Sequence, residues 1–255
     1  DSVAQHPRTT SFAQSPGSSK IDSLPEMDFV QTHSYGMNDM VAMAQQWCLS
    51  KTAAYGKPHF VGEFGLSDPT TECNSDCQGV NILNGITAPA FVQCAGQSMT
   101  WWWDNFVDPH NLYHLWSVPG DFLSRVDFST AQHWSPAVVQ ANASDANAEV
   151  LGVAGDNKTV LLFYRNKQFY WKNWLQTHGA APPTIGGVSI AVGGLVPGLA
   201  TVSWTQLGGP SMQRGGGEQP PQQPQHRRGM QGWMAAQPRA WAPASVQLRL
   251  PTLGA

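Results

Sequence analysis

One stretch of ten residues decides the fold, the sequence GKPHFVGEFG that runs from Gly56 to Gly65. Its apolar run His59–Phe64 follows Gly56 and Pro58, which end a preceding helix, and therefore predicts a strand. Glu63 stands at the carboxyl end of that strand, between glycines that let another molecule approach the backbone closely. In a parallel barrel this end of a strand faces the active-site mouth. Taken alone, Glu63 is either a reactive carboxylate there or a residue that caps the next helix or pairs with a cation.

Residues 1–134 alternate short apolar runs with helical stretches, which is the pattern of βα units and predicts an α/β fold. Strands are predicted at residues 28–33, 59–64 and 98–103, with an earlier one at Thr9–Phe12. The helix after the first of these begins at a capping Asp39 and has apolar residues at i, i+3, i+4 and i+7. These apolar residues are Met40, Met43, Ala44 and Trp47. Two further helical stretches are predicted at 79–95 and 111–124.

Residues 135–209 have a different pattern, in which short β-rich runs are separated by Gly, Asn and Asp. The pattern predicts a small antiparallel β-sandwich of five or more strands. The runs are Val150–Val153, Thr159–Arg165, Gln168–Trp171, Ile185–Val192 and Thr201–Thr205. Tight hairpin turns are predicted at Asp156-Asn157 and at Asn166-Lys167.

The last segment, residues 210–255, is rich in Gly, Pro, Gln and Arg. We predict that it is disordered, because it cannot bury enough apolar surface to offset its ordering entropy. Its five Arg stand against one Glu, whereas the whole chain has a net charge of −3. A basic interaction tail and an unrelated or misread extension both remain open interpretations of this segment.

Composition excludes several classes of protein. Of the 255 residues 41% are hydrophobic, including 11 Trp and 10 Phe, which is too apolar for a fully disordered chain. The net charge is −3 and no long Lys/Arg stripe appears, so nucleic-acid binding has little electrostatic support. No apolar run approaches the roughly 18–20 residues that span a bilayer. The chain begins Asp-Ser-Val without a signal peptide, and we expect it to be a fragment.

Two other strand ends carry side chains that suit a sugar. His33 and Tyr35 are two residues apart on one face of a strand, where they can bond hydroxyl groups and hold the Glu63 carboxylate. A buried His with a core Tyr is the alternative. The rings of Trp101–Trp103 can stack on sugar C–H surfaces, and Asp104 can accept hydroxyl protons. A Trp-rich core is the alternative here, and it explains one or two of the three rings.

Together these motifs resemble the distal half of a clan-A (β/α)8 retaining glycoside hydrolase, of the family 5 cellulase and mannanase type. The resemblance rests on the order His-x-Tyr, Lys-Pro, Gly-Glu-Phe-Gly and Trp-Trp-Trp-Asp-Asn and covers residues 6–208. It implies a partial barrel of about strands 5–8, followed by an accessory β-sandwich. By this resemblance Glu63 is the nucleophile of strand 7, and His33 and Tyr35 belong to strand 6. The Trp run is then strand 8, with Trp101 or Trp103 as the platform for the attacked sugar.

One catalytic group of that family has no counterpart in this chain. The family's acid/base is a Glu that follows an Asn at the end of strand 4, and none of the Glu residues here follows an Asn. The resemblance therefore implies that the N-terminal half of the barrel, with strands 1–4, is missing. The fragment alone is expected to be inactive, because a retaining enzyme needs both a nucleophile and an acid.

Four cysteines, Cys48, Cys73, Cys77 and Cys94, all fall within residues 1–134 and allow three pairings. Disulfides, free thiols and zinc binding all remain open, although the cysteine spacing is irregular for zinc and no His lies close in sequence. Two glycosylation patterns, at Asn142 and Asn157, agree weakly with export. We expect a secreted, extracellular protein.

The leading interpretation is a fragment of a retaining β-glycosidase that hydrolyses O-glycosidic bonds of a β-linked poly- or oligosaccharide. It is expected to need no cofactor and no metal, and its partners would be the carbohydrate substrate and the missing half of the barrel. One alternative is a catalytically inert carbohydrate-binding protein that keeps the aromatic platform. Another is a non-enzymatic β-sandwich adhesion module with a barrel remnant.

Overall fold

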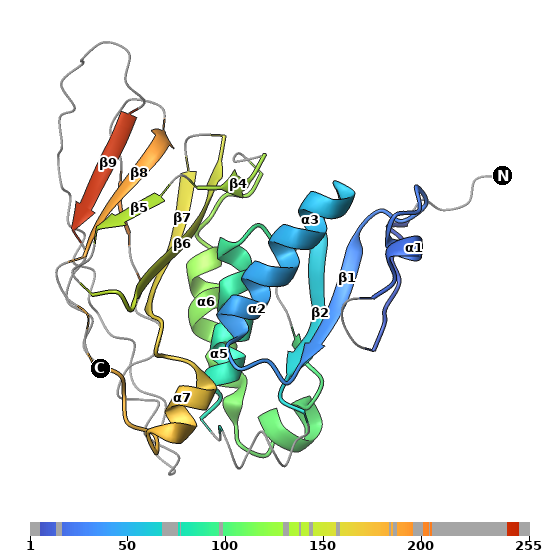
Figure 1. The fold of residues 1–255 in the computed structure, drawn as a ribbon, viewed down its shortest axis with the longest axis horizontal. Helices are drawn as coiled ribbons and strands as arrows, with labels where there is room; N and C mark the ends of the chain where they lie inside the picture. Colours follow the sequence, from blue (N-terminus) through green and yellow to red (C-terminus); the bar gives the residue numbers. More distant parts are fainter. Residues whose placement is uncertain are drawn as a thin grey trace.

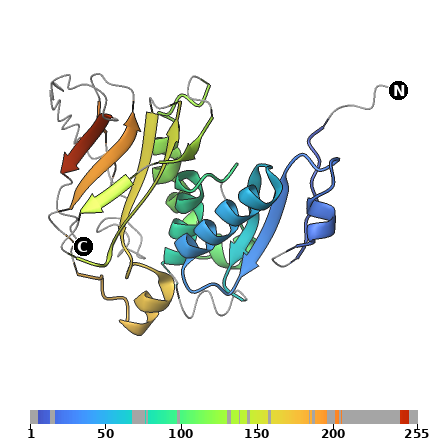
Figure 2. The ribbon, with the colours of Figure 1, turned by 45° about the horizontal axis from the view of Figure 1, so that its top comes forward.

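The computed structural model arranges the chain in successive layers. A parallel sheet, a layer of helices and two antiparallel sheets follow one another across the molecule (Figure 1), and the turned view in Figure 2 shows the same order. The structure describes residues 6–13, 17–67, 76, 78–96, 99–129, 133–137, 139–142, 145–156, 159–183, 185, 188–195, 201–203, 205 and 244–249.

The parallel sheet contains β1 (Val30–Tyr35), β2 (His59–Gly65) and β3 (Met99–Thr100), in that order. The three strands predicted there are present, although the third is only two residues long. Residues 9–12 form no strand, so the expectation of an earlier strand is wrong. The nearby Arg8 carbonyl accepts backbone hydrogen bonds just ahead of β1, but no ladder extends from it in the described part of the chain. The sheet stays open within the described residues, and the partial barrel remains a prediction.

The connection from β1 to β2 is a nearly continuous helical rod. It consists of α2 (Met40–Ala44), the π-helical turn η1 (Gln45–Leu49) and α3 (Ser50–Tyr55). As predicted, the Asp39 side chain caps its first turn. Gly56 ends it in the left-handed conformation, with φ at 62°, which a residue with a Cβ rarely adopts.

The other described helices that precede the antiparallel strands are short, and α1 lies beyond β1, apart from the helix layer (Figure 1). They are α1 (Ser19–Asp22), α5 (Val80–Thr87), η2 (Ala88–Phe91), η3 (Trp103–Val107), η4 (Leu112–Trp116) and α6 (Ser117–Leu123). The helical stretches predicted at 79–95 and 111–124 are therefore confirmed. Figure 1 shows that α2, α3 and α5 lie together on one face of the parallel sheet. No helix in the described part of the chain is long and apolar enough to cross a bilayer.

The antiparallel strands form two three-stranded sheets. One sheet has the order β4 (Ser135–Pro136), β6 (Ala148–Gly155) and β7 (Thr159–Asn166), and the other has the order β5 (Val139–Asn142), β8 (Ser189–Leu195) and β9 (Ala244–Arg249). β6 and β7 pair as the hairpin predicted around Asp156, which adopts a positive φ of 49°. Of the two glycosylation patterns, Asn142 ends β5 and Asn157 lies outside the described residues.

β7 contributes to two hydrophobic cores because its side chains alternate between the faces of its sheet. Leu161 and Phe163 belong to the core that fills the helix layer. Leu162 packs instead with Ile190 and Val192 of the facing sheet. The middle sheet therefore packs against other layers on both faces, with its buried side chains toward the helices and partly buried ones toward the facing sheet.

Three parts of the predicted sandwich and tail differ from the structure. Gln168–Trp171 forms no strand; the chain turns after β7, and α7 (Trp171–Gln176) begins there. The Trp171 indole is buried and donates to the Met37 carbonyl at 2.7 Å, and this contact with the helix layer outweighs the local β-propensity. Residues 201–203 and 205 also form no strand. β9 lies in the segment predicted to be disordered, yet its backbone pairs with β8, and the rest of that segment is outside the described residues.

Candidate active site

An extra residue in β2 determines where Glu63 points. Thr32 of β1 pairs with Val61, but the next pair along the strands is His33 with Glu63. Gly62 is therefore left without a partner in β1, as the extra residue of a β-bulge. A bulge of this kind changes which face of the sheet the following side chains occupy.

The bulge brings three predicted residues onto one face. Val61 before it and Phe64 after it are both buried in the core beneath the helices. In a regular strand Glu63 would follow Val61 into that core, because side chains repeat their direction every second residue. With the extra residue, Glu63 instead lies on the opposite face, where it meets His33 and Tyr35.

Two side chains contact one oxygen of the Glu63 carboxylate. The Tyr35 hydroxyl donates to Oε2 at 2.5 Å, and His33 Nδ1 lies 3.3 Å from the same oxygen. The Glu63 side chain is 20% exposed, so it can be reached from the open face of the sheet. Among the described residues both of these contacts are made to Oε2, and no hydrogen bond engages Oε1.

His33 is itself positioned by two side chains that the sequence analysis did not identify. Ser11 Oγ lies 3.0 Å and Gln31 Nε2 lies 3.2 Å from His33 Nε2. With the amide nitrogen of Gln31 as a donor, His33 Nε2 accepts, and the proton of the neutral ring is then on Nδ1, toward Glu63. Gly62 makes room for this arrangement, since a Cβ there would lie 2.7 Å from Gln31 Cδ. The period-two spacing of Gln31 and His33 was a usable signal, whereas Ser11 is too distant in sequence to give one.

The Trp run contains two exposed rings and one that packs inward. Trp101 and Trp103 are 55% and 54% exposed. Trp102 packs against the core and donates its ring N–H to the Leu66 carbonyl at 3.3 Å. The predicted strand therefore ends at Thr100, and the Trp run forms a bend and the first residue of η3. Aromatic faces exposed in this way are suited to stacking on the C–H surface of a sugar.

The register of β3 places Met99 beside Glu63. These two residues pair, so their side chains occupy the same face, and Trp101 follows Met99 by two residues, in the bend just after the strand. Asp104 is exposed and lies in the first turn of η3. Desolvation first, Asp108 next and the charge of Asp104 last raise the pKa of the Tyr113 hydroxyl. The structure thus brings together His33, Tyr35 and Glu63, and Asp104 takes part in neither of the contacts that join them.

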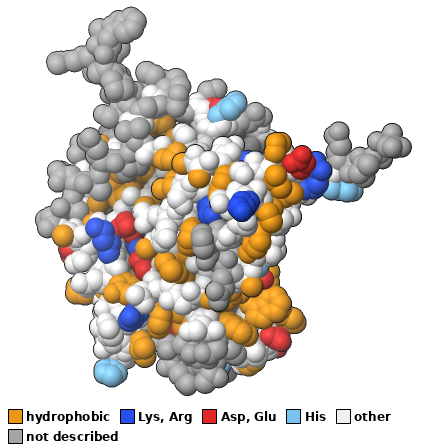
Figure 3. Space-filling view, turned by 45° about the vertical axis from the view of Figure 1, so that its right-hand side comes forward, with side chains coloured by type: hydrophobic (Ala, Val, Ile, Leu, Met, Phe, Trp, Pro, Cys, Tyr) orange, Lys and Arg blue, Asp and Glu red, His pale blue; other side chains and the backbone are white. Residues whose placement is uncertain are grey.

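The surface on this side of the molecule has few charges. Figure 3, turned toward the parallel-sheet side, shows hydrophobic side chains and uncharged surface over most of the described part, with charged side chains at scattered positions. This agrees with the small charged share of the whole chain, 12%. A neutral ligand with hydroxyl groups and apolar faces suits such a surface better than a charged one.

One group of metal-ligand side chains lies elsewhere, among the residues beneath the helices. It consists of Cys48, His59 and Cys94, and the two cysteines form a disulfide. This bond selects one of the three pairings that the sequence left open. Cys73 and Cys77 lie outside the described residues.

Comparisons with known proteins assign no family to the chain. No protein-family model matches it, and no curated protein matches it either. The fold and the site define an α/β protein whose open parallel sheet carries one carboxylate held by a Tyr and a His. The resemblance to retaining glycoside hydrolases is carried further as a proposal.

Proposed function

We propose that the chain is the distal half of a retaining β-glycosidase in which Glu63 is the nucleophile. The observation that carries this proposal is the geometry of one carboxylate, because Tyr35 and His33 both hold its Oε2 on the open face of the sheet. Contacts to Oε2 fix the orientation of the Glu63 carboxylate and leave Oε1 to attack the sugar. A nucleophile in covalent catalysis needs this kind of fixed orientation.

The arrangement of the helices supports a segment of a barrel. Parallel strands of a doubly wound sheet carry helices on both faces, whereas barrel strands carry them on the outer face. Here the connecting helices lie on one face (Figure 1), and the Glu63 side chain is on the other. In the proposed barrel this second face is the interior, and the remaining strands come from an N-terminal half that is the chain's partner.

In the proposed reaction Glu63 Oε1 attacks the anomeric carbon and forms a glycosyl ester, while an acid protonates the departing oxygen. Water then cleaves the ester. The acid must lie about 5–5.5 Å from the nucleophile. Among the described residues Glu149 is bonded to Arg165, and Glu26 precedes β1 at the other end of the sheet, so neither fits. We therefore assign the acid to the missing half and expect no hydrolysis of unactivated glycosides by this chain alone.

Two further features support the substrate class and the compartment. Trp101 and Trp103 are exposed close to the carboxyl end of the sheet and are proposed to stack on a β-linked poly- or oligosaccharide. The disulfide between Cys48 and Cys94 supports secretion, because such bonds persist in oxidising compartments.

A catalytically inert carbohydrate-binding protein is the second candidate. The observation that favours it is that neither Glu26 nor Glu149 is placed to act as the acid. A protein of this kind would use the exposed Trp rings for binding and would perform no chemistry.

Covalent labelling tests the nucleophile directly. The probes are the 2,4-dinitrophenyl 2-deoxy-2-fluoro β-glucoside and β-mannoside, whose leaving group departs without protonation. As the bond from C1 to a Glu63 oxygen forms, the bond to dinitrophenolate breaks, and the fluorine slows hydrolysis of the resulting ester. We expect one sugar on the peptide that contains Glu63, and none in Glu63→Gln. Glu26→Gln, which removes an exposed carboxylate, is the matched control and should label like the parent.

The labelling is done with this chain and with the longer parent that the proposal requires. A label on another residue, or equal labelling of Glu63→Gln, would show that Glu63 is not the nucleophile. Binding of β-linked oligosaccharides that Trp101→Ala abolishes, without any labelling of the parent, would favour the inert binding protein instead.

A further inference from the structure

A second group of reactive side chains lies beneath the helices. His59 begins β2, Cys48 lies in η1 and Cys94 follows η2, so three separate segments meet there. Cys48 and Cys94 are 46 residues apart in sequence, and their Cα atoms are 5.1 Å apart across the disulfide. The two sulfur atoms and one ring nitrogen of His59 all lie within 4.8 Å of one another.

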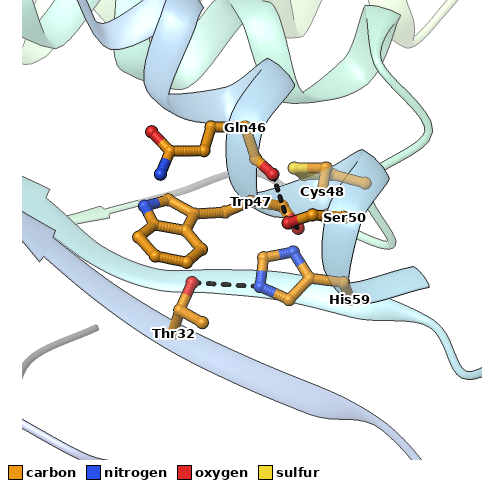
Figure 4. The surroundings of a disulfide bond; sticks show 7 residues. Thr32, Gln46, Trp47, Cys48, Ser50 and His59 are labelled. Carbon is orange, nitrogen blue, oxygen red and sulfur yellow. Dashed lines mark hydrogen bonds between the residues drawn. A yellow bond between two sulfur atoms is a disulfide. The ribbon is translucent and has the colours of Figure 1, made fainter. Parts of the chain in front are cut away.

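His59 has one ring nitrogen without a hydrogen-bond partner. The side chain is 0% exposed, and its Nε2 lies 3.0 Å from Thr32 Oγ1. Its Nδ1 is buried and makes no hydrogen bond within the described residues. Figure 4 shows the ring next to Cys48 and Ser50, with one nitrogen toward Thr32 and the other on the side of Cys48. A buried polar atom without a partner lowers the stability of the fold, and a ligand bound to His59 Nδ1 would remove this cost.

The donor set has the chemistry of a zinc site. Two cysteine sulfurs and one imidazole nitrogen are ligands that zinc prefers, and no carboxylate oxygen takes part. Burial first and the charge of Lys51 second lower the pKa of His59 to about 4, so the ring is neutral near pH 7, as a metal ligand must be. The Lys51 ammonium is balanced by Asp22, whose Oδ2 lies 3.7 Å from it.

We propose that Cys48, Cys94 and His59 Nδ1 bind one Zn²⁺ ion when the cysteines are reduced, and that the disulfide is the oxidised state of the same site. Reduction by a dithiol breaks the S–S bond and adds two electrons and two protons, while the dithiol becomes a disulfide. Zn²⁺ then displaces the two thiol protons, and the two thiolates balance the charge of the ion. A water molecule or a small thiol completes the coordination.

The dimensions agree with this exchange. A tetrahedral zinc ion with Zn–S bonds near 2.3 Å needs its ligand atoms about 3.5–3.8 Å apart. The three donor atoms already lie within 4.8 Å, so rotation of side chains suffices once the S–S bond is broken. In either state the site ties the helical rod before β2 to the segment that precedes β3. The fold would thus keep this link in oxidising and in reducing surroundings.

Zinc titration of the full chain tests the proposal. A Cys73→Ser/Cys77→Ser background removes the other thiols, a phosphine reduces the protein, and Zn²⁺ is added in competition with a chromophoric chelator. We expect one ion per reduced chain and none per oxidised chain. Co²⁺ in place of Zn²⁺ should give a thiolate-to-metal absorption band with a tetrahedral visible spectrum.

Variants decide which residues are ligands. His59→Gln can still bond Thr32, and it should bind zinc at least tenfold more weakly and change the cobalt spectrum. His114→Gln, which alters an exposed His, should bind like the parent. Cys94→Ser keeps His59 and should lose tight binding, so the proposal can be tested even where His59→Gln does not fold. Equal zinc affinity in the folded His59→Gln protein, tight binding by Cys94→Ser, or no binding by the reduced parent would overturn the proposal.

Discussion

We expect Arg165→Met to destabilise the fold strongly, because this guanidinium joins the antiparallel sheets to the helix layer. Its Nη1 and Nη2 donate to the two oxygens of Asp39 at 2.9 and 2.6 Å, and its Nε donates to Glu149 at 2.6 Å. The side chains are 6%, 19% and 17% exposed, so solvent screens the network little. Asp39 also caps α2 directly after β1, and the network therefore supports the strand that carries His33 and Tyr35.

The expected loss of stability in Arg165→Met comes from the carboxylates of Asp39 and Glu149, which it leaves largely buried without this partner. Burial alone would lower the pKa of Arg165, but its bonds to Asp39 and Glu149 raise it above its ordinary value, so attraction outweighs desolvation. Loss of one partner from a buried ion pair costs about 3–5 kcal/mol. Asp39→Asn removes the charge but keeps an oxygen for the helix cap, whereas Asp39→Ala also loses the cap and should cost about 1 kcal/mol more.

Urea unfolding followed by Trp fluorescence and far-ultraviolet circular dichroism measures these effects. The parent should unfold in a single transition, because Phe163 of the middle sheet belongs to the core of the helix layer. The double variant Arg165→Met/Asp39→Asn gives the coupling energy of the pair. Arg125→Met, which alters an exposed Arg, is the control and should stay within about 0.5 kcal/mol of the parent. A loss below about 1 kcal/mol in Arg165→Met, or no coupling with Asp39→Asn, would refute the reasoning.

Three further predictions concern the bulge, a buried carboxyl group and the last strand. Gly62→Ala should destabilise the protein by about 1 kcal/mol or more and shift the imidazole NMR signals of His33, since the new Cβ would lie 2.7 Å from Gln31 Cδ; unchanged signals would contradict this. Burial raises the pKa of Asp76 to about 7, so the folded state keeps a proton that the unfolded chain has lost, and the free energy of unfolding should fall as pH rises from about 4 to 7. Asp76→Asn should flatten this part of the profile in urea titrations at several pH values, and equal slopes would argue against it. Deleting residues 211–255 removes β9 and exposes the edge of β8, so the Tm should fall by about 2–4 °C for each kcal/mol lost, whereas an unchanged Tm would show that β9 adds no stability.

Local spacing explains which parts of the candidate site the sequence could predict. His33 and Tyr35 are two residues apart, so any strand places them on one face, and their common contact with Glu63 was a reasonable expectation. The bulge at Gly62 was not predictable, because it exists only through the register with β1. Ser11 was missed for a similar reason, since nothing in its own surroundings marks it as a partner of His33.

The same distinction holds for the fold. Helix ends were predictable from Asp39 and Gly56, because a cap is a contact within one turn of the chain. Gln168–Trp171 was predicted as a strand from its β-propensity, but the Met37 carbonyl, which lies far away in sequence, accepts the Trp171 N–H and helps to hold a helix there. β9 was missed because its pairing with β8 spans a long stretch of chain, and composition carries no signal of such a contact.

The bulge also explains how one short strand can carry two different kinds of chemistry. Before Gly62, His59 and Val61 lie beneath the helices, where an imidazole can meet the sulfurs of Cys48 and Cys94. After it, Glu63 lies on the open face, where a carboxylate can meet a ligand. A strand without the extra residue would place His59, Val61 and Glu63 on one face, and the carboxylate would be buried beneath the helices without its Tyr and His donors. The separation of the two proposed sites therefore depends on a single residue without a side chain. A Cβ added there would lie 2.7 Å from Cδ of Gln31, the side chain that also contacts His33.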